Sequence, residues 1–102
     1  MGLREELLER VRAIPHGQVA NYGSLGASLS RPVSGVIVGR WLNHTPEDVP
    51  WWRVVGRDGR LPIWKKDPSL EALQAARLAE EGIEVVEGVV ARRFFFEPSE
   101  DL

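Results

Sequence analysis

Apolar residues at helical spacing open the chain. Leu3, Leu7, Val11 and Ile14 fall on one face of a helix. Glutamates lie in its early turns and arginines in its later ones, as the helix dipole favours. The sequence predicts a helix that runs to about Ile14. Pro15 and Gly17 then end it, and residues 18–21 form a short extended link.

Two further short helices are expected after this link. The first covers about Tyr22 to Leu29 and the second about Val33 to Asn43. The turn Ser30-Arg31-Pro32 separates them, and we expect Ser30 to cap the second of the two and Pro32 to suit its first turn. Two short helices joined by a tight turn make a helix-turn-helix, with residues 33–43 as the recognition helix.

The second half of the chain alternates turns and short elements. Asp58-Gly59 predicts a turn between two short extended runs. Asp67 is expected to cap a helix that starts at Pro68, continues through Leu70, Leu73, Ala76 and Leu78 to Glu81, and stops at Gly82. Residues 83–86 and 89–96 are expected to form a terminal hairpin around Gly88. The predicted fold class is mainly α with small β elements, in a single domain of residues 1–102.

The expected recognition helix carries a stripe with almost no side chains. Ser34, Gly35 and Gly39 form this stripe. Small residues let the backbone approach either another helix or a nucleic acid, and the sequence leaves both partners open.

Composition excludes several kinds of chemistry. The chain has 102 residues and no cysteine, so thiol nucleophiles, disulfides and cysteine-ligated metals are excluded. His16 and His44 are the only histidines, which disfavours a metal enzyme, and no cofactor is expected. No apolar run reaches the roughly 18 residues of a membrane span, and the first residues lack the pattern of a signal peptide. We therefore expect a cytoplasmic protein without membrane association.

Charge is unevenly distributed along the chain. Residues 31–70 carry a local balance of +3, whereas residues 71–102 carry -5. A basic middle can offer a phosphate-binding face, although charge alone is equally compatible with an ordinary solvated surface.

Two adjacent tryptophans follow a proline and precede an arginine. In an extended segment Trp51 and Trp52 point to opposite sides, so they cannot both face one apolar layer. One is then expected to anchor the core, and the other is a candidate platform on which a planar ligand stacks.

Several ordered motifs resemble the alkyltransferase-like proteins, relatives of the O6-alkylguanine-DNA alkyltransferases. The resemblance covers about residues 4–86. It rests on Ile14-Pro15-His16-Gly17-Gln18-Val19, Asn21-Tyr22-Gly23, Val38-Gly39-Arg40 with Leu42-Asn43, Val49-Pro50-Trp51-Trp52-Arg53-Val54-Val55 and Glu81-Gly82-Ile83-Glu84-Val85. It implies a winged helix-turn-helix-like fold, that of the alkyltransferase C-terminal domain.

The resemblance also implies a function without catalysis. The alkyltransferases carry Pro-Cys-His-Arg where this chain has Pro50-Trp51-Trp52-Arg53, and an indole cannot accept an alkyl group at neutral pH. Glu81 matches the acid of the family's cysteine-histidine-glutamate relay and is expected to be structural. The function implied is recognition of O6-alkylguanine in double-stranded DNA from the minor groove, with the base flipped into a pocket. Delivery to nucleotide-excision repair proteins follows from the same resemblance, and we expect a monomer.

The resemblance assigns roles to individual residues. Tyr22 matches the tyrosine that pushes against the target nucleotide's phosphate, with a place in the core of the first two helices as the alternative. Arg53 is either a DNA contact or a structural donor to the loop. The DNA-binding candidates are Tyr22, Ser34, Gly35, Val36, Gly39, Arg40 and Arg53, and the lesion-pocket candidates are Tyr22, Pro50, Trp51 and Trp52.

The chain departs from its relatives at several positions. The family inserts an arginine finger where this chain has Val36, and valine cannot hydrogen-bond to the orphaned cytosine. Thr45-Pro46 stands where the transferases have an Asn-Pro hinge, and the roles of Trp64, Lys65 and Lys66 are unassigned. Two other functions stay open: a generic DNA-binding or architectural module without lesion selectivity, and a protein-interaction module built on Trp51, Trp52 and Trp64.

Overall fold

The computed structural model describes residues 2–42, 48–61 and 68–96, and its first helix follows the predicted apolar face. Helix α1 spans Leu3–Arg12, two residues short of the predicted end, and buries Leu7, Leu8 and Val11. Ile14 lies in the turn that follows, where its N–H donates to the carbonyl of Val11 at 3.1 Å, and its side chain is buried. The predicted face is therefore correct, although its last residue belongs to the turn.

Helices α2 and α3 form the expected helix-turn-helix. Helix α2 spans Tyr22–Ala27, and Asn21 caps it by accepting from the N–H of Ser24 at 2.7 Å. Helix α3 spans Gly35–Trp41, and the cap is Ser34. The prediction that Ser30 caps this helix is wrong, because Glu6 of α1 accepts both the N–H and the hydroxyl of Ser30, at 2.8 and 2.7 Å.

A short parallel pair of strands joins the two halves of the chain. Strand β1 (Ala20–Asn21) pairs with β2 (Val54–Val55), with Ala20 opposite Val54. The segment Trp51–Arg53 before β2 is a 3-10 helix, η2, so the condition of an extended segment, under which the two tryptophans point to opposite sides, is not met. The turn around Asp58-Gly59 is present, with the N–H of Gly56 donating to the carbonyl of Arg60 at 2.8 Å and Gly59 at φ +87°.

Helix α4 and a small hairpin complete the chain. Helix α4 spans Pro68–Glu80. Gly82, at φ +83°, lets the N–H of Ile83 reach back to the carbonyl of Leu78 at 3.0 Å, which ends the helix as predicted. The expected cap Asp67 lies outside the described residues, as do Asn43, Thr45, Pro46, Trp64, Lys65 and Lys66.

The terminal hairpin is shorter than expected. Strands β3 (Val85–Val86) and β4 (Val89–Val90) pair antiparallel, and a 3-10 helix, η4 (Arg92–Phe94), follows. The prediction of one strand over residues 89–96 is wrong. Beyond η4 the chain leaves the hairpin and pairs with Val19, whose N–H donates to the carbonyl of Phe94 at 2.9 Å and whose carbonyl accepts from Phe96 at 2.6 Å.

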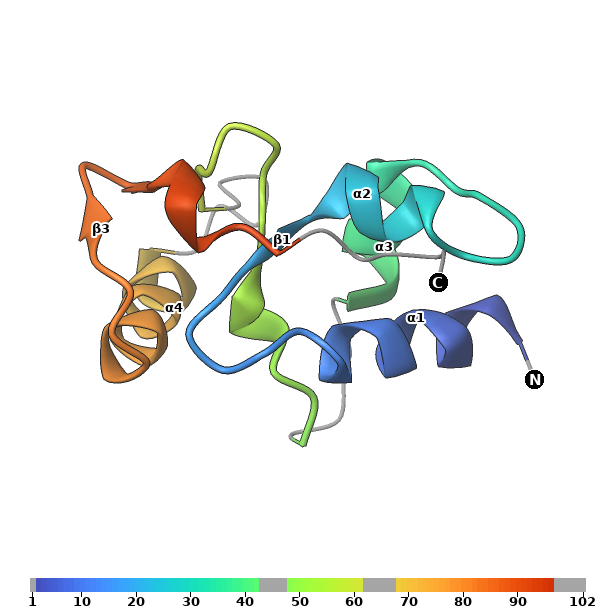
Figure 1. Ribbon diagram of the computed structural model, residues 1–102, viewed down its shortest axis with the longest axis horizontal. Coiled ribbons are helices and arrows are strands. Elements are labelled where there is room, and N and C mark those ends of the chain that lie inside the picture. The colour runs from blue at the N-terminus through green and yellow to red at the C-terminus, as the bar shows by residue number, and fades with distance from the viewer. Residues whose placement is uncertain (1, 43–47, 62–67, 97–102) are drawn as a thin grey trace.

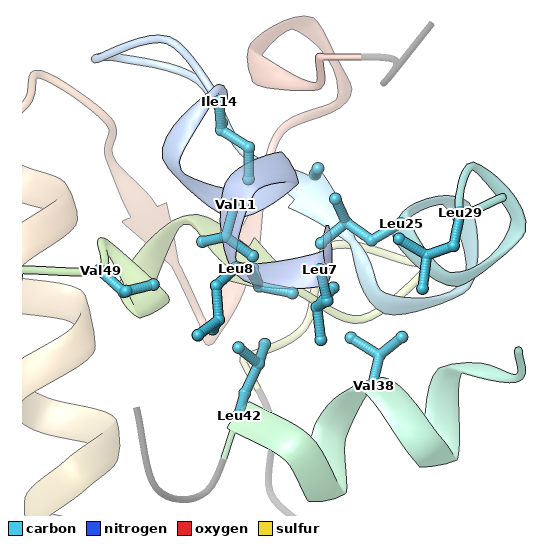
Figure 2. Close-up of a cluster of buried hydrophobic side chains, with 11 residues drawn as sticks. Leu7, Leu8, Val11, Ile14, Leu25, Leu29, Val38, Leu42 and Val49 are labelled. Carbon is cyan, nitrogen blue, oxygen red and sulfur yellow. The ribbon is translucent and has the colours of Figure 1, made fainter. Parts of the chain in front are cut away.

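Two apolar clusters form the core. The larger one lies among α1, α2 and α3, where Leu7 and Leu8 face Val38 of α3 and Leu42, the residue after this helix (Figure 2). The second cluster includes Val55, Leu78 and Ile83 and lies between α4 and the terminal elements. Figure 1 shows α1, α2 and α3 at one end of the molecule and α4 with β3 at the other, with β1 between them. The expected class, mainly helical with small sheets, is confirmed. None of the helices among the described residues is long and apolar enough to span a membrane.

Candidate nucleic-acid interface

Glycines let α2 and α3 pack at very short range. A Cβ on Gly26 would collide with the backbone carbonyl of Val33 and would come within 3.1 Å of Val38. A Cβ on Gly35 would lie 3.2 Å from both the nitrogen of Gly23 and the Cβ of Tyr22. The angle between the two helices is therefore fixed by the absence of side chains at these two positions.

The two glycines of the small-residue stripe on α3 face the rest of the protein. Gly35 lies against α2, and Gly39 is buried. Of the two partners that the sequence left open for these glycines, the structure shows another helix for Gly35 and the protein interior for Gly39. Ser34 is exposed, and its hydroxyl oxygen accepts from the N–H of Ile37 at 3.3 Å, which caps α3.

The outward face of α3 consists of different residues. Val36 is 70% exposed, and Arg40 is exposed one helical turn further along. Because residues four apart lie on the same side of a helix, Val36 and Arg40 share this face. No carboxylate among the described residues forms an ion pair with Arg40. The helix thus presents an apolar residue beside an exposed cation.

Tyr22 lies at the start of α2 and is partly buried. It packs against the larger core cluster, which agrees with the structural role that the sequence left open. Tyr22 follows the carboxyl end of β1, whereas the Trp51–Arg53 segment precedes the amino end of β2. Because the strands are parallel, the two groups lie at opposite ends of the strand pair. A lesion pocket that includes all four predicted residues has to span this pair.

Pro50 starts the turn that presents the two tryptophans. It is buried, with φ -77° and ψ 68°, and the N–H of Trp51 donates to the carbonyl of Val49 at 2.7 Å, which makes an inverse γ-turn. Trp51 and Trp52 then meet edge to face, with ring centroids 6.0 Å apart and an interplanar angle of 82°. Both are partly buried, and Trp52 packs against the second core cluster, as expected for one of the pair.

A carboxylate from the end of α4 collects the donors around this turn. Glu81 accepts from Trp52 Nε1 at 2.8 Å and from the backbone N–H of Gly17 at 2.9 Å. Arg53 pairs with the same carboxylate, with 2.8 Å between Nη2 and Oε2, and donates through Nη1 to the carbonyl of Ile14 at 2.9 Å. Glu81 therefore joins the loop at Gly17 and η2 to the end of α4, and Arg53 extends this network to Ile14.

This environment favours the charged form of Glu81. Burial raises the pKa of its carboxyl, but the hydrogen bonds from Arg53, Gly17 and Trp52 and the charge of Arg53 outweigh burial and leave the pKa below its ordinary value. Glu81 is thus an ionised acceptor at neutral pH. The expectation that it is structural agrees with these contacts.

The chain matches a known protein family. A family model described as 6-O-methylguanine DNA methyltransferase, DNA binding domain, matches residues 2–83. The chain belongs to this family.

Curated relatives extend the match and set its limits. A bifunctional methyltransferase/endonuclease of Thermoplasma volcanium is 34% identical over 87 residues, which are 83% of this chain and 27% of that protein. A methylated-DNA-protein-cysteine methyltransferase of Salmonella typhimurium is 43% identical over 60 residues, which are 57% of this chain and 35% of that protein. The chain spans about a third or less of the length of these relatives.

Two solved structures share the whole fold of this methyltransferase-family chain. The crystal structure of S. pombe Atl1 with damaged DNA containing O6-carboxymethylguanine has a TM-score of 0.80 and 28% identity, and the match covers 94% of this chain and 95% of Atl1. A structure of S. pombe ATL with DNA gives a TM-score of 0.82 and 26% identity, covering 93% and 94%. The resemblance to alkyltransferase-like proteins and the fold that it implied are confirmed.

Arg53 is the arginine of the tryptophan motif, for which the sequence left two roles open, a DNA contact or a structural donor. Its contacts in the structure are those of a structural donor. Its side chain is only 14% exposed, and its guanidinium nitrogens contact Glu81 and the carbonyl of Ile14. Arg53 holds the turn in place, whereas Arg40 remains the outward cation of the predicted DNA-binding set.

Two residues of α4 contact this turn and were missing from the sequence-based set. Gln74 is 2% exposed, and its Nε2 donates to the carbonyls of Trp52 and Val54, both at 3.0 Å. The guanidinium of Arg77 lies 5.1 Å from the centroid of the Trp52 ring. A signal for Gln74 existed, because it stands between Leu70 and Leu78 at four-residue spacing, on the face of α4 that is buried.

Proposed function

We propose that this chain binds double-stranded DNA and recognises O6-alkylguanine without transferring the alkyl group to itself. The single observation that carries the proposal is the match to Atl1 bound to O6-carboxymethylguanine DNA, which extends over nearly the whole of both chains. The identity of 28% and the family match support the transfer of this binding function.

Helix α3 is the element proposed to enter the minor groove. Its exposed face carries Val36 and Arg40, and its N-terminus begins at the Ser34 cap. Arg40 supplies a cation for a backbone phosphate, which positions a protein on DNA without reading its sequence. Val36 supplies an apolar group that can wedge against a base step. Tyr22, at the start of α2, is proposed to press on the phosphate of the target nucleotide.

The lesion pocket is proposed at the Trp51–Arg53 turn. Trp51 stands where the alkyltransferases carry cysteine, and Pro50 and Trp52 flank it. Bases stack on aromatic rings with about 1 to 3 kcal/mol each, so a partly exposed indole can hold a flipped guanine. The network around Glu81 supports a turn that is already formed before the base arrives.

Alkyl transfer has no acceptor in this chain. The 102 residues contain no cysteine, and in this motif Trp52, whose Nε1 donates to Glu81, occupies the position of the catalytic histidine. A general base and a thiolate are therefore both missing from the motif. A site with this fold and these residues can bind the lesion but lacks the groups that transfer its alkyl group.

A binding titration tests the proposal directly. Duplexes that differ only in O6-methylguanine or guanine at one position are titrated with the protein. The proposal requires tighter binding to the lesion duplex, affinity that falls as salt rises, and no gain in protein mass after incubation with methylated DNA. A mass gain of one methyl group per chain would sink the non-enzymatic part, and no binding to either duplex would favour a protein-interaction module.

A generic DNA-binding module is the second candidate. It is favoured by the presence of Val36 where the family has an arginine finger. Flipping a base costs a few kcal/mol, and a charged hydrogen bond to the orphaned cytosine contributes about 1.5 to 3 kcal/mol. Because Val36 lacks that hydrogen bond, other contacts have to offset the cost of flipping the base. Equal affinity for the lesion and the guanine duplex would favour the generic module.

Hand-over to nucleotide-excision repair completes the proposal. A protein that binds a lesion without chemistry can act by marking it for other proteins. Incision of an O6-alkylguanine duplex by a reconstituted excision-repair system, with and without this chain, tests this step. The proposal expects faster incision when the chain is present, and an unchanged rate would contradict it.

A further inference from the structure

Helix α4 contacts the tryptophan turn through two side chains on one of its faces. Gln74 and Arg77 are three residues apart and therefore neighbours on the helix. Gln74 donates both of its amide hydrogen bonds to the turn, one to the carbonyl of Trp52 and one to that of Val54. Arg77 places its guanidinium 5.1 Å from the centroid of the Trp52 ring. The backbone and the ring of Trp52 are thus both held from α4.

Burial of the Gln74 amide has a free-energy cost, which its two hydrogen bonds offset. An amide side chain that is 2% exposed gives up its hydration, and it recovers that cost only by bonding to the two carbonyls. Those carbonyls belong to η2 and to the first residue of β2. The amide therefore fixes where η2 ends and where the strand starts.

Trp52 in turn fixes Trp51. The two rings meet edge to face, so a rotation of Trp52 removes the surface on which Trp51 rests. The indole N–H of Trp52 is already held by Glu81 at 2.8 Å. Arg77 adds a planar cation over the ring. The chain of contacts runs from α4 through Trp52 to Trp51.

We propose that Gln74 and Arg77 are positioning residues that hold Trp51 in the orientation in which it stacks on an alkylated guanine. This inference rests on the proposed function, because it names residues that serve the same pocket. A pocket wall that is fixed before binding does not have to be ordered by the ligand, which raises affinity for the lesion. Neither residue need contact DNA for this effect.

Arg77→Met is the main test, and Arg92→Met is its matched control. Arg77 is exposed, so the variant is expected to fold. Arg92 of η4 is also an exposed arginine over an aromatic ring, 5.5 Å from the centroid of Phe95, so its variant loses the same charge and the same kind of contact elsewhere. We expect Arg77→Met to weaken binding to the O6-methylguanine duplex about two- to fivefold while the guanine duplex is unaffected. Arg77→Lys, which keeps the cation, should recover part of the loss.

A spectroscopic readout follows the tryptophans without DNA. The indole N–H signals of the free protein are recorded by nitrogen-proton NMR, and the signals of Trp51 and Trp52 are assigned from Trp51→Phe and Trp52→Phe. Arg77→Met and the isosteric Gln74→Met should both shift the signals of Trp51 and Trp52, whereas Arg92→Met should leave them in place. If Gln74→Met does not fold, Arg77→Met decides the question alone.

Two results would overturn the inference. One is an equal loss of affinity for both duplexes in Arg77→Met and Arg92→Met, which would mean that only charge was lost. The other is an unchanged Trp51 signal in Arg77→Met. If the wild type itself does not distinguish the two duplexes, the proposed function fails, and the NMR shifts still report whether α4 positions Trp51.

Discussion

The guanidinium of Arg53 and the carboxylate of Glu81 form an ion pair of 2.8 Å, although 28 residues separate them in the chain. Their side chains are 14% and 6% exposed, so the pair is largely removed from water. The same carboxylate accepts from Gly17 and Trp52. Residues from two other sequence motifs, residues 14–19 and 49–55, therefore depend on this one acceptor.

Removing that acceptor should destabilise the domain. Loss of one partner from a buried ion pair typically costs about 3 to 5 kcal/mol, since the remaining charge stays buried. We expect Glu81→Ala to lower the free energy of unfolding by about that amount, measured by urea denaturation. Glu80→Ala, at the exposed neighbouring residue, should change it by no more than about 0.5 kcal/mol. Similar small changes in both variants would show that the network contributes little.

Acid should remove the same contribution. Burial raises the pKa of Glu81, but its hydrogen bonds and the charge of Arg53 lower it further, so the folded-state pKa lies below the usual glutamate value. A group with a lowered folded-state pKa stabilises the fold above the unfolded-state pKa of about 4.3, and that stabilisation is lost as the pH falls through the lowered value. The difference in unfolding free energy between wild type and Glu81→Gln should therefore be full at neutral pH and shrink below about pH 4. A difference that grows on acidification would contradict this assignment.

The local patterns along the sequence were sufficient to predict the helices and their apolar faces. Leu7, Val11 and Leu78 are buried where the spacing placed them, and Gly82 ends α4 as its position suggested. What the patterns could not supply is the long-range use of individual groups. Ser30 was the predicted cap of α3, but its N–H and hydroxyl donate to Glu6, 24 residues away, and Ser34 caps the helix instead.

The same limit explains the errors around the site. The run of residues 89–96 is apolar enough for a strand, but pairing with Val19 draws its end away from the hairpin. The inverse γ-turn at Pro50 and the amide of Gln74 hold the tryptophan segment as a 3-10 helix, and no local signal encodes a bond to a residue on α4. Arg53 could be assigned to a motif from sequence, yet its contacts are with Glu81 and the carbonyl of Ile14, which lie in distant segments of the chain.

Close packing of α2 against α3 should make Gly26 irreplaceable. A methyl group there would meet the backbone carbonyl of Val33, which cannot move aside without shifting the turn. Overpacking of this kind costs about 1 to 3 kcal/mol and outweighs the gain in helix propensity. Gly26→Ala should lower the melting temperature. Gly23→Ala in the same helix is the control, because its new methyl would only approach the Asn21 side chain at 3.3 Å, and equal losses in both would rule out the packing argument.

Arg40 should contribute to the salt dependence of DNA binding. A phosphate contact releases about one counterion, so Arg40→Ala should weaken binding similarly for all duplex sequences and reduce the slope of log affinity against log salt by about 1. Arg12→Ala removes an equal charge from α1, where Arg12 is paired with Glu9 and Asp48. We expect that control to leave the slope nearly unchanged. An unchanged slope in Arg40→Ala would place the phosphate contact at another residue, such as Arg31.

Substitution of Val36 tests whether the missing arginine finger limits lesion recognition. At 70% exposure the side chain of Val36 is largely free of packing contacts. The free energy of unfolding of Val36→Arg should therefore lie within about 0.5 kcal/mol of the wild-type value. The new guanidinium can hydrogen-bond to an orphaned cytosine, and about 1.5 kcal/mol from that bond corresponds to roughly tenfold tighter binding of the O6-methylguanine duplex. Val36→Lys adds the same charge without the planar fork, so it separates hydrogen bonding from general attraction to phosphate. A 2-aminopurine next to the lesion reports unstacking by a rise in fluorescence. If Val36→Arg folds normally, binds no tighter than Val36→Lys and leaves that fluorescence flat, the base stays in the helix and the flipping step is wrong for this protein.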